Sequence, residues 1–235
     1  MDITGSVALV TGANRGIGRQ FALDLLERGA AKVYATARNP HSIDIPGVRT
    51  LALDVTDPAS IAAAAAAAPD VNLLINNAGV SAHQNLVTGD LVKMHAEVDT
   101  MVWGPLSVIR AFAPALERNG GGAILNVLSA MSWFSYDGAN SYAVAKAAEW
   151  AVTNGVRLEL AKHGTLVTAL HMGAVDTDMM AGFDIDKLPP SEVVRAALDG
   201  VQAGRLEVLA DDWSRHVKAA LAGDPSAFYP QTVPA

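Results

Sequence analysis

Tyr142 and Lys146 lie four residues apart in a segment whose pattern predicts a helix. Residues at this spacing share one helix face, so the phenol and the ammonium group are expected to be neighbours. A free phenol has a pKa of about 10 and is a poor base at neutral pH, but a nearby positive charge favours its ionised form. Ser129 precedes Tyr142 by thirteen residues and ends an apolar run. These side chains are suited to general acid–base chemistry.

A glycine-rich segment, residues 11–18 with the sequence TGANRGIG, stands between an apolar run and a helical pattern. Glycines there permit a tight turn and let the backbone approach a pyrophosphate at the N-terminus of the helix. The pattern alone also fits an ordinary turn, and its spacing, GxxxGxG, is a variant of the usual dinucleotide fingerprint. The flanking strand and helix favour a dinucleotide site.

The segment after the second predicted strand indicates which dinucleotide is bound. NAD sites usually place an acidic side chain there, about 20 residues beyond the glycines, for the ribose 2′-hydroxyl. Here Arg38 follows Thr and Ala, and no acid is present. A guanidinium suits a 2′-phosphate, and Arg15 inside the glycine loop offers a second contact. Each arginine alone also fits a solvated surface charge, but together they favour NADP(H).

The elements that must position these groups alternate between apolar strands and helices. Strands with little polar alternation, each followed by a helix, indicate a parallel sheet covered on both faces. We therefore predict one α/β domain over residues 1–235, doubly wound and Rossmann-type, with a mobile substrate loop at 178–190. Gly104 and Pro105 are expected to kink the longest helix. The expected strands are 7–11, 32–37, 50–54, 71–75, 123–128, 166–170 and 206–210, and the expected helices are 15–28, 58–68, 90–116, 140–162 and 191–203.

Composition argues against several other classes of protein. The 235 residues are 51% hydrophobic and 17% charged, which supplies a large core and is too apolar for a disordered chain. A net charge of −7 disfavours duplex nucleic acid as a partner. The chain has no cysteine, and its six histidines lack ligand spacing, so no metal is expected. No run approaches the roughly 20 apolar residues of a membrane span, and no targeting segment is evident, so a cytoplasmic protein is expected.

The motifs together resemble the short-chain dehydrogenase/reductase family in its single-domain form. The resemblance implies that Tyr142 is the general acid/base, that Lys146 lowers its pKa and holds the nicotinamide ribose, and that Ser129 orients the substrate carbonyl. It covers nearly the whole chain through TGANRGIG (11–18), NNAG (76–79), Ser129, YAVAK (142–146) and HMGAVDT (171–177).

The same resemblance implies a set of residues that bind the coenzyme. Asp54 and Val55 are expected to contact adenine, and Val175 and Thr177 to hold the carboxamide. The full expected set is Gly12, Asn14, Arg15, Gly16, Ile17, Gly18, Arg38, Asp54, Val55, Asn77, Ala78, Gly79, Tyr142, Lys146, Val175 and Thr177.

Two positions depart from the family pattern. Met101 stands where relatives usually have an asparagine, and a thioether cannot replace the hydrogen bonds of an amide. This puts in doubt the ordered water and proton relay that reach Lys146 in relatives. Asp99 is near in sequence but is expected on another helix face. Met172 replaces a proline, which is expected to free the loop after the sixth strand and reshape the pocket.

Apolar side chains near the motifs predict an apolar pocket for a small carbonyl or alcohol substrate, although such residues are more often core. They are Trp103, Met131, Trp133, Phe134, Tyr136, Met179, Met180 and Phe183. Relatives usually pair through their long helices, so a homodimer or homotetramer is implied. Ala147, Trp150, Ala151 and Val156 form a face compatible with that pairing.

The expected activity is hydride transfer between NADP(H) and a ketone, aldehyde or secondary alcohol. The alternative is a non-catalytic NADP(H)-binding sensor or scaffold, which Met101 favours and the retained Tyr142, Lys146 and Ser129 disfavour. An epimerase or dehydratase is a third reading, less favoured because no sugar-nucleotide domain is evident. Substrate identity, direction and stereochemistry do not follow from the sequence.

Overall fold

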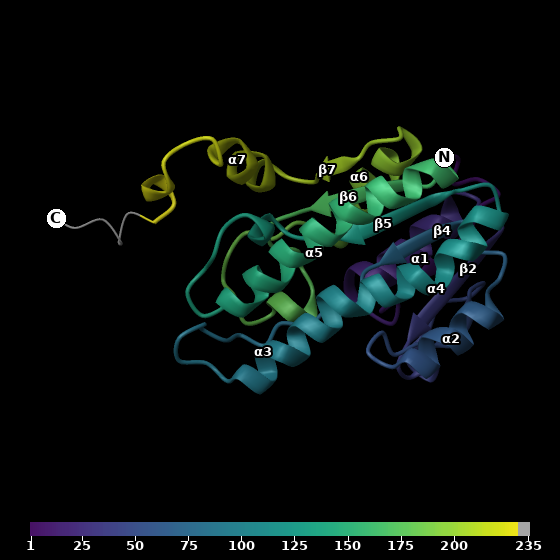
Figure 1. Ribbon diagram of the computed structural model, residues 1–235, viewed down its shortest axis with the longest axis horizontal. Coiled ribbons are helices and arrows are strands. Elements are labelled where there is room, and N and C mark those ends of the chain that lie inside the picture. Colours follow the sequence, from purple (N-terminus) through teal and green to yellow (C-terminus); the bar gives the residue numbers. More distant parts are fainter. Residues whose placement is uncertain (230–235) are drawn as a thin grey trace.

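A parallel sheet forms the centre of the computed structural model, which describes residues 1–229. Its seven strands lie in the order β3-β2-β1-β4-β5-β6-β7 (Figure 1). The order reverses between β1 and β4, and in doubly wound folds ligands bind beyond the carboxyl ends of the strands at this reversal. The predicted Rossmann-type fold is confirmed. The strands are β1 (Val7–Val10), β2 (Lys32–Ala37), β3 (Arg49–Ala52), β4 (Leu73–Asn76), β5 (Ala123–Val127), β6 (Leu166–His171) and β7 (Glu207–Leu209).

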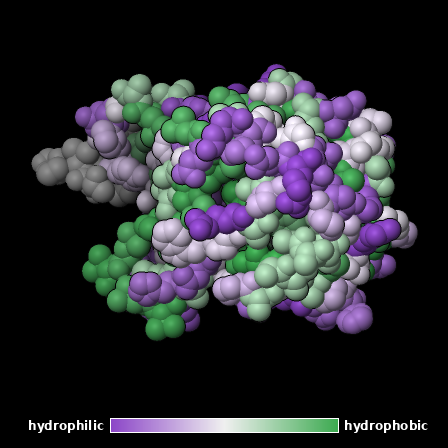
Figure 2. Space-filling view, turned by 45° about the vertical axis from the view of Figure 1, so that its right-hand side comes forward, coloured by the Kyte–Doolittle hydropathy of each residue, from purple (hydrophilic) through white to green (hydrophobic). Residues whose placement is uncertain are grey.

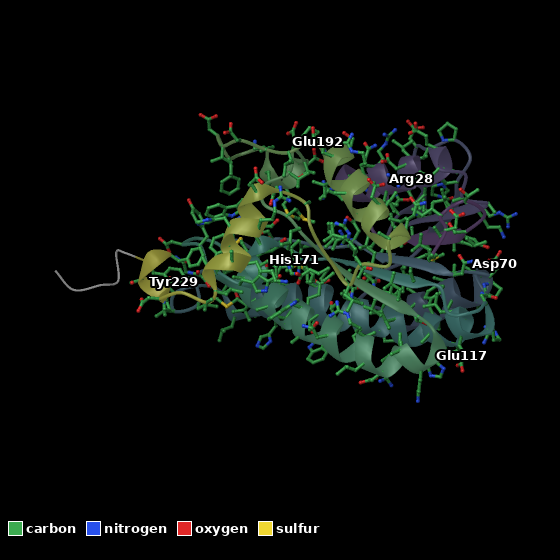
Figure 3. All side chains as sticks on the ribbon, turned by 90° about the horizontal axis from the view of Figure 1, so that it is seen from above. Arg28, Asp70, Glu117, His171, Glu192 and Tyr229 are labelled. Atoms are coloured by element: carbon green, nitrogen blue, oxygen red, sulfur yellow. The ribbon has the colours of Figure 1, made fainter. Side chains whose placement is uncertain are left out.

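Helices cover both faces of the sheet, and each face has its own core (Figure 3). Phe21 and Leu25 of α1 pack with α6 against one face, where Arg28 and Asp199 join the two helices at 2.7 Å. The other core contains side chains from α2, α4 and α5. The helices are α1 (Gly16–Glu27), α2 (Pro58–Ala67), α3 (Leu91–Val98), α4 (Gly104–Arg118), α5 (Asn140–Leu160), α6 (Pro190–Gln202) and α7 (Asp212–Ala220).

Aspartate caps begin three of these helices. The Asp57 carboxylate accepts the N–H of Ala59 ahead of α2, as its place before Pro58 predicts. Asp90 caps α3 in the same way. Asp211 and Ser214 exchange hydrogen bonds in a capping box at the start of α7. α7 itself was not anticipated from the sequence.

The long helix predicted over 90–116 is divided rather than simply kinked. A π-helical segment, Asp99–Trp103, separates α3 from α4, directly before the expected kink at Gly104. A side-chain β-carbon at Gly104 would come within 3.0 Å of Val55, so glycine permits this helix to lie close to the β3 edge. π segments insert one extra residue into a helical turn and often occur at functional sites. This one turns Met101 inward.

The segment predicted as a mobile substrate loop is closed at its base by two backbone hydrogen bonds. The N–H of Asp176 donates to Leu188, and the N–H of Leu188 donates to Ala174, both at 2.9 Å. Between them Phe183 and Ile185 are exposed. Mobility of the loop stays a prediction. In the described residues, no helix has the length and apolar character needed to cross a bilayer. The single-domain prediction includes residues 230–235, which lie outside the described chain.

Candidate active site

A cleft of about 440 Å³ opens at the carboxyl edge of the sheet, where the strand order reverses. It brings together motifs that are far apart in the sequence, from the glycine loop to α5. Predicted residues that line it are Gly12, Asn14, Arg15, Gly16, Ile17, Arg38, Asp54, Val55, Asn77, Ala78, Gly79, Tyr142, Lys146 and Thr177. Gly18, Ser129 and Val175 are buried and do not line the cleft.

The glycine loop has the close approaches that a dinucleotide cradle requires. Gly12 has a φ of +66° and Gly16 a φ of +54°, a backbone region that glycine adopts without strain. A β-carbon at Gly18 would lie 2.2 Å from the Gly12 carbonyl oxygen. Helix α1 therefore starts directly at the cleft, with its first N–H groups available to an anion. The residues present fit a pyrophosphate at this position.

Two polar side chains fix the glycine loop to the end of β4. The Thr11 hydroxyl oxygen accepts the N–H groups of Asn77 and Ala78, both at 2.9 Å. The Asn77 amide donates in return to the Thr11 and Gly12 carbonyls at 3.0 and 3.3 Å. These bonds make the loop rigid before any ligand arrives.

The two arginines expected at a 2′-phosphate both line the cleft. Arg38 follows β2 with an exposed side chain and has no hydrogen-bond or salt-bridge partner among residues 1–229. Hydrogen bonds from Thr56, together with the charge of Arg38, lower the pKa of Asp54. Arg15 is 3.4 Å from Asp178, and both side chains are largely exposed. Arg38 is therefore open to an anionic ligand, whereas Arg15 is shared with an acid.

Tyr142, Ser129 and Lys146 meet where β5 ends beside α5. The Tyr142 hydroxyl faces Ser129 closely enough for the serine hydroxyl to lower the pKa of the phenol. The Lys146 Nζ atom lies 5.7 Å from the centre of the Tyr142 ring and donates to the Val127 carbonyl at 2.7 Å. A hydroxyl, a phenol and an ammonium group thus stand side by side at the cleft, as the sequence predicts. This arrangement can donate a proton to an oxygen or remove one.

Burial raises the pKa of Tyr142 above its usual value of 10.0. Lys146 and the Ser129 hydrogen bond lower it, as expected, but two buried carboxylates, Glu149 and Glu97, raise it further. Burial lowers the pKa of Lys146, but the neighbouring Glu149 and Tyr142, together with Glu97, outweigh that effect and raise it. Without a bound coenzyme, the phenol is therefore held in its protonated form.

The model of the short chain dehydrogenase family matches residues 6–187. The protein is a short-chain dehydrogenase. A solved short-chain dehydrogenase from Burkholderia cenocepacia, in complex with NADP, is 37% identical, with a TM-score of 0.94 over the whole of both chains. A 3-oxoacyl-acyl-carrier-protein reductase of Escherichia coli is 30% identical over 92% of this chain and 94% of its own. That of Brucella melitensis, solved with NADH, is 26% identical, covers 88% and 98%, and has a TM-score of 0.81.

This dehydrogenase carries Met101 at the cleft wall with a fully buried side chain. Its sulfur is 3.6 Å from where a β-carbon at Gly79 would stand, so it fills the space between the NNAG turn and α5. Asp99 is exposed on the same π segment and does not replace the missing amide. Within the described residues, the side chain that hydrogen-bonds to Lys146 instead comes from the same helix, α5.

That partner is Glu149, which the sequence analysis missed. Its Oε2 atom accepts from the Lys146 Nζ at 2.7 Å, and the two side chains are only 3% and 6% exposed. A glutamate three residues after Lys146 shares its helix face, and this spacing was the available signal. Glu97 of α3 was also missed. It accepts the N–H of Ala82 through one oxygen, while its Oε2 atom has no partner among residues 1–229.

The turn after β6 is held firmly despite Met172. The Met172 carbonyl accepts the N–H of Ala130 at 2.8 Å, and the N–H of Gly173 donates to the Asp211 carboxylate at 2.6 Å. These bonds hold the turn in this conformation, and the expectation that losing a proline frees this loop stays a prediction. Beyond the turn, the Thr177 hydroxyl donates to the carbonyl of the buried Val175 at 3.3 Å.

The expected apolar cluster divides into two groups. Trp133 stacks on the buried His171 with ring centres 3.9 Å apart, and Phe134 packs on Trp213. Neither residue lines the cleft, and their place at a substrate pocket stays a prediction. Met179 lines the cleft, and Phe183 lies 6.0 Å from the His83 ring near its mouth.

His171 supports the site from behind. Because a carbonyl only accepts, its Nδ1–H donates to the Ser129 oxygen at 3.0 Å. Burial lowers the pKa of His171 to about 4, so the ring is neutral at neutral pH. The histidine therefore orients the Ser129 backbone without adding charge to the cleft.

Proposed function

We propose that this dehydrogenase transfers hydride from NADPH to a ketone or aldehyde, reversibly, with Tyr142 as the general acid/base. The observation that carries the proposal is the contact of Tyr142 with Ser129 and Lys146 at the edge of a cleft whose far end holds a glycine cradle and an unpaired arginine. NADP in a relative that is 37% identical supports this coenzyme. Arg38, in the place of an acid, supports it independently.

Each side chain has a distinct role in the proposed reaction. The bound coenzyme supplies the hydride, which enters the carbonyl carbon while the oxygen becomes an alkoxide. Tyr142 gives its hydroxyl proton to that oxygen, and Ser129 orients the same oxygen by a hydrogen bond. Lys146 holds the ribose through the one N–H that is not directed at Val127 or Glu149. The Arg38 guanidinium pairs with the 2′-phosphate.

The substrate is proposed to carry an apolar group. Met101, Met172 and Met179 line the cleft beside Tyr142. Hydrophobic side chains gather on the part of the surface around α3 and the loop before it, at the lower left of Figure 2. The exposed ones in α3 and the loop before it are Leu86, Val87, Leu91 and Val92. Phe183 and Ile185 are exposed in the loop at 178–190. Relatives named as 3-oxoacyl-acyl-carrier-protein reductases make 3-oxoacyl thioesters one class to test.

The test is NADPH consumption with a panel of aryl ketones, 3-oxoacyl thioesters and, as polar comparison, aldohexoses. We expect turnover of an apolar carbonyl, with NADPH preferred to NADH. Tyr142→Phe should abolish turnover, whereas the matched control Tyr34→Phe, whose hydroxyl bonds Asp70 and does not line the cleft, should retain it. Coenzyme binding without turnover of any carbonyl would favour the sensor or scaffold instead.

We also propose that the chain forms a homodimer or homotetramer through α5. One face of this helix is exposed along its length, with Val144, Ala147, Ala151 and Leu158 at helical spacing. Val156, which the sequence analysis placed on this face, is buried in the core, and Trp150 is half-buried. Ala151→Arg should convert an oligomer to a monomer by light scattering, and a monomeric wild type would contradict the proposal.

A further inference from the structure

Lys146 is paired with an acid inside the protein rather than being left as a lone cation. Its ammonium group donates to Glu149 and to the Val127 carbonyl, both at 2.7 Å, and both charged side chains are almost completely buried. The wall opposite is Met101, which is fully buried and offers no hydrogen-bonding amide. Glu149 is therefore the only carboxylate bonded to Lys146 among the described residues.

The balance of charge around Tyr142 follows from the groups that face it. Lys146 and Glu149 come from α5, Glu97 from α3, and the Ser129 hydroxyl from the end of β5. His171 of β6 is neutral, and the charge of Lys146 contributes to lowering its pKa. A lone ammonium would favour the phenolate, and a carboxylate 2.7 Å from that ammonium offsets its field. Burial raises the pKa of Glu149, and the adjoining ammonium opposes that rise.

We propose that Glu149 is a positioning residue that biases this site towards reduction. By pairing with Lys146 it keeps Tyr142 protonated near neutral pH, which is the form that delivers a proton to a forming alkoxide. The inference rests on the proposed function of Tyr142. The carbonyl gains a hydride from the coenzyme and a proton from Tyr142, and the resulting phenolate recovers a proton from water before the next turnover.

The consequence is a pH dependence with a defined sign. Reduction needs the phenol, so its rate falls as pH rises through the pKa of Tyr142. Oxidation of an alcohol needs the phenolate, so its rate rises through the same pKa. Removing the Glu149 charge leaves the charge of Lys146 unopposed, which lowers the pKa of Tyr142. The falling limb of the reduction profile and the rising limb of the oxidation profile then both move to lower pH.

The experiment measures kcat/KM against pH in both directions for wild type and Glu149→Gln. We expect both limbs to move to lower pH by about one unit or more, so that oxidation at pH 7 rises about tenfold. Glu149→Asp retains the charge and should keep the limbs near their wild-type positions. Glu159→Gln, an exposed acid on the same helix, is the matched control and should change nothing. Limbs that stay in place while kcat falls equally at every pH would mean that Glu149 is only structural, and the inference would be overturned.

A second measurement decides the matter if Glu149→Gln does not fold. The ultraviolet absorbance of wild type minus that of Tyr142→Phe, followed against pH without coenzyme, reports the ionisation of Tyr142 directly. A transition above about pH 9 that moves to lower pH in Glu149→Ala supports the inference. A clear wild-type transition below that value, or no shift in Glu149→Ala, overturns it. An active Tyr142→Phe enzyme would instead refute the proposed function, which separates the two failures.

Discussion

The two walls of the cleft are built by different means. The coenzyme wall, formed by the glycine loop and the ends of β1, β2 and β4, depends on backbone geometry: a positive φ at Gly12, a missing side chain at Gly18 and two N–H groups bound by Thr11. The catalytic wall, formed by the end of β5, α3, the π segment and α5, depends on side chains whose charges act on one another. Lys146, Glu149 and Glu97 all influence Tyr142 there.

This difference determines which features can change without loss of the fold. Backbone geometry at the coenzyme wall permits few residue types, because a β-carbon 2.2 Å from a carbonyl oxygen cannot be accommodated. At the catalytic wall, Met101 stands where the family pattern has an amide, and the buried charges of Lys146 and Glu149 remain paired. Chemistry is therefore tuned at the second wall, while coenzyme binding is retained at the first.

The largest expected effect separates the two walls. Tyr142→Phe removes the transferable proton but no group that contacts a phosphate. We expect kcat to fall by ~10²–10⁴-fold, while the Kd for NADPH, measured by fluorescence titration, stays within about twofold. Substantial turnover in this variant would refute the role of Tyr142, and loss of NADPH binding would show that the walls are not independent.

Lys146→Ala tests the one residue expected to serve both walls. The rate and the NADPH affinity should both fall, and the free energy of unfolding should drop by about 3–5 kcal/mol because Glu149 is left as an unpaired buried acid. The double variant Lys146→Ala/Glu149→Ala serves as control. Its melting temperature should recover in part and its activity should not. Equal melting temperatures for the single and double variants would contradict the importance of the ion pair.

Arg38→Asp acts on the coenzyme wall alone. Losing one charge-assisted contact is worth about 1.5–3 kcal/mol, so kcat/KM for NADPH should fall roughly tenfold or more relative to NADH. The introduced carboxylate also suits a ribose 2′-hydroxyl. Arg19→Asp makes the same change of charge at an arginine in α1 and is the control for net charge. An unchanged preference between the coenzymes would remove Arg38 from the 2′-phosphate site.

Met101→Asn is expected to have the smallest effect on activity. Glu149 already holds Lys146, and an amide placed among Val102, Ala145 and the partly buried Val98 lacks partners. The cost in stability is about 1–3 kcal/mol, with no gain in kcat. Met101→Leu, which preserves volume, should change the melting temperature less. A higher kcat with an unchanged melting temperature would show that a relay through position 101 can be restored.

The pattern of apolar residues, and the glycines and prolines that interrupt it, predicted most of the fold. Short apolar runs gave all seven strands to within about two residues, because buried parallel strands tolerate little else. α7 was missed because it is short and polar on average, and only Ser214 and Val217 of it are buried. The π segment was anticipated only as a kink, since Gly104 and Pro105 mark a break but do not specify an extra residue in the preceding turn.

The candidate site was predictable where a motif requires a fixed backbone and unpredictable where distant side chains meet. Tyr142 and Lys146 are joined by one helix, so their spacing fixed their geometry. Glu97 reaches the same place from another helix, and no local pattern reports that approach. Trp133 shows the converse: it lies only four residues after Ser129, yet nothing in that spacing predicts that it stacks on His171 of β6.

One carboxylate fastens the end of the chain to the cleft. Asp211 accepts the N–H of Ser214 with one oxygen and the N–H of Gly173 with the other. The same side chain thus caps α7 and holds the turn beside Met172. A truncation that removes Asp211 would remove both bonds. It would therefore release the turn after β6, beside which substrate and nicotinamide are expected to bind, although the truncation is far from every catalytic group in sequence.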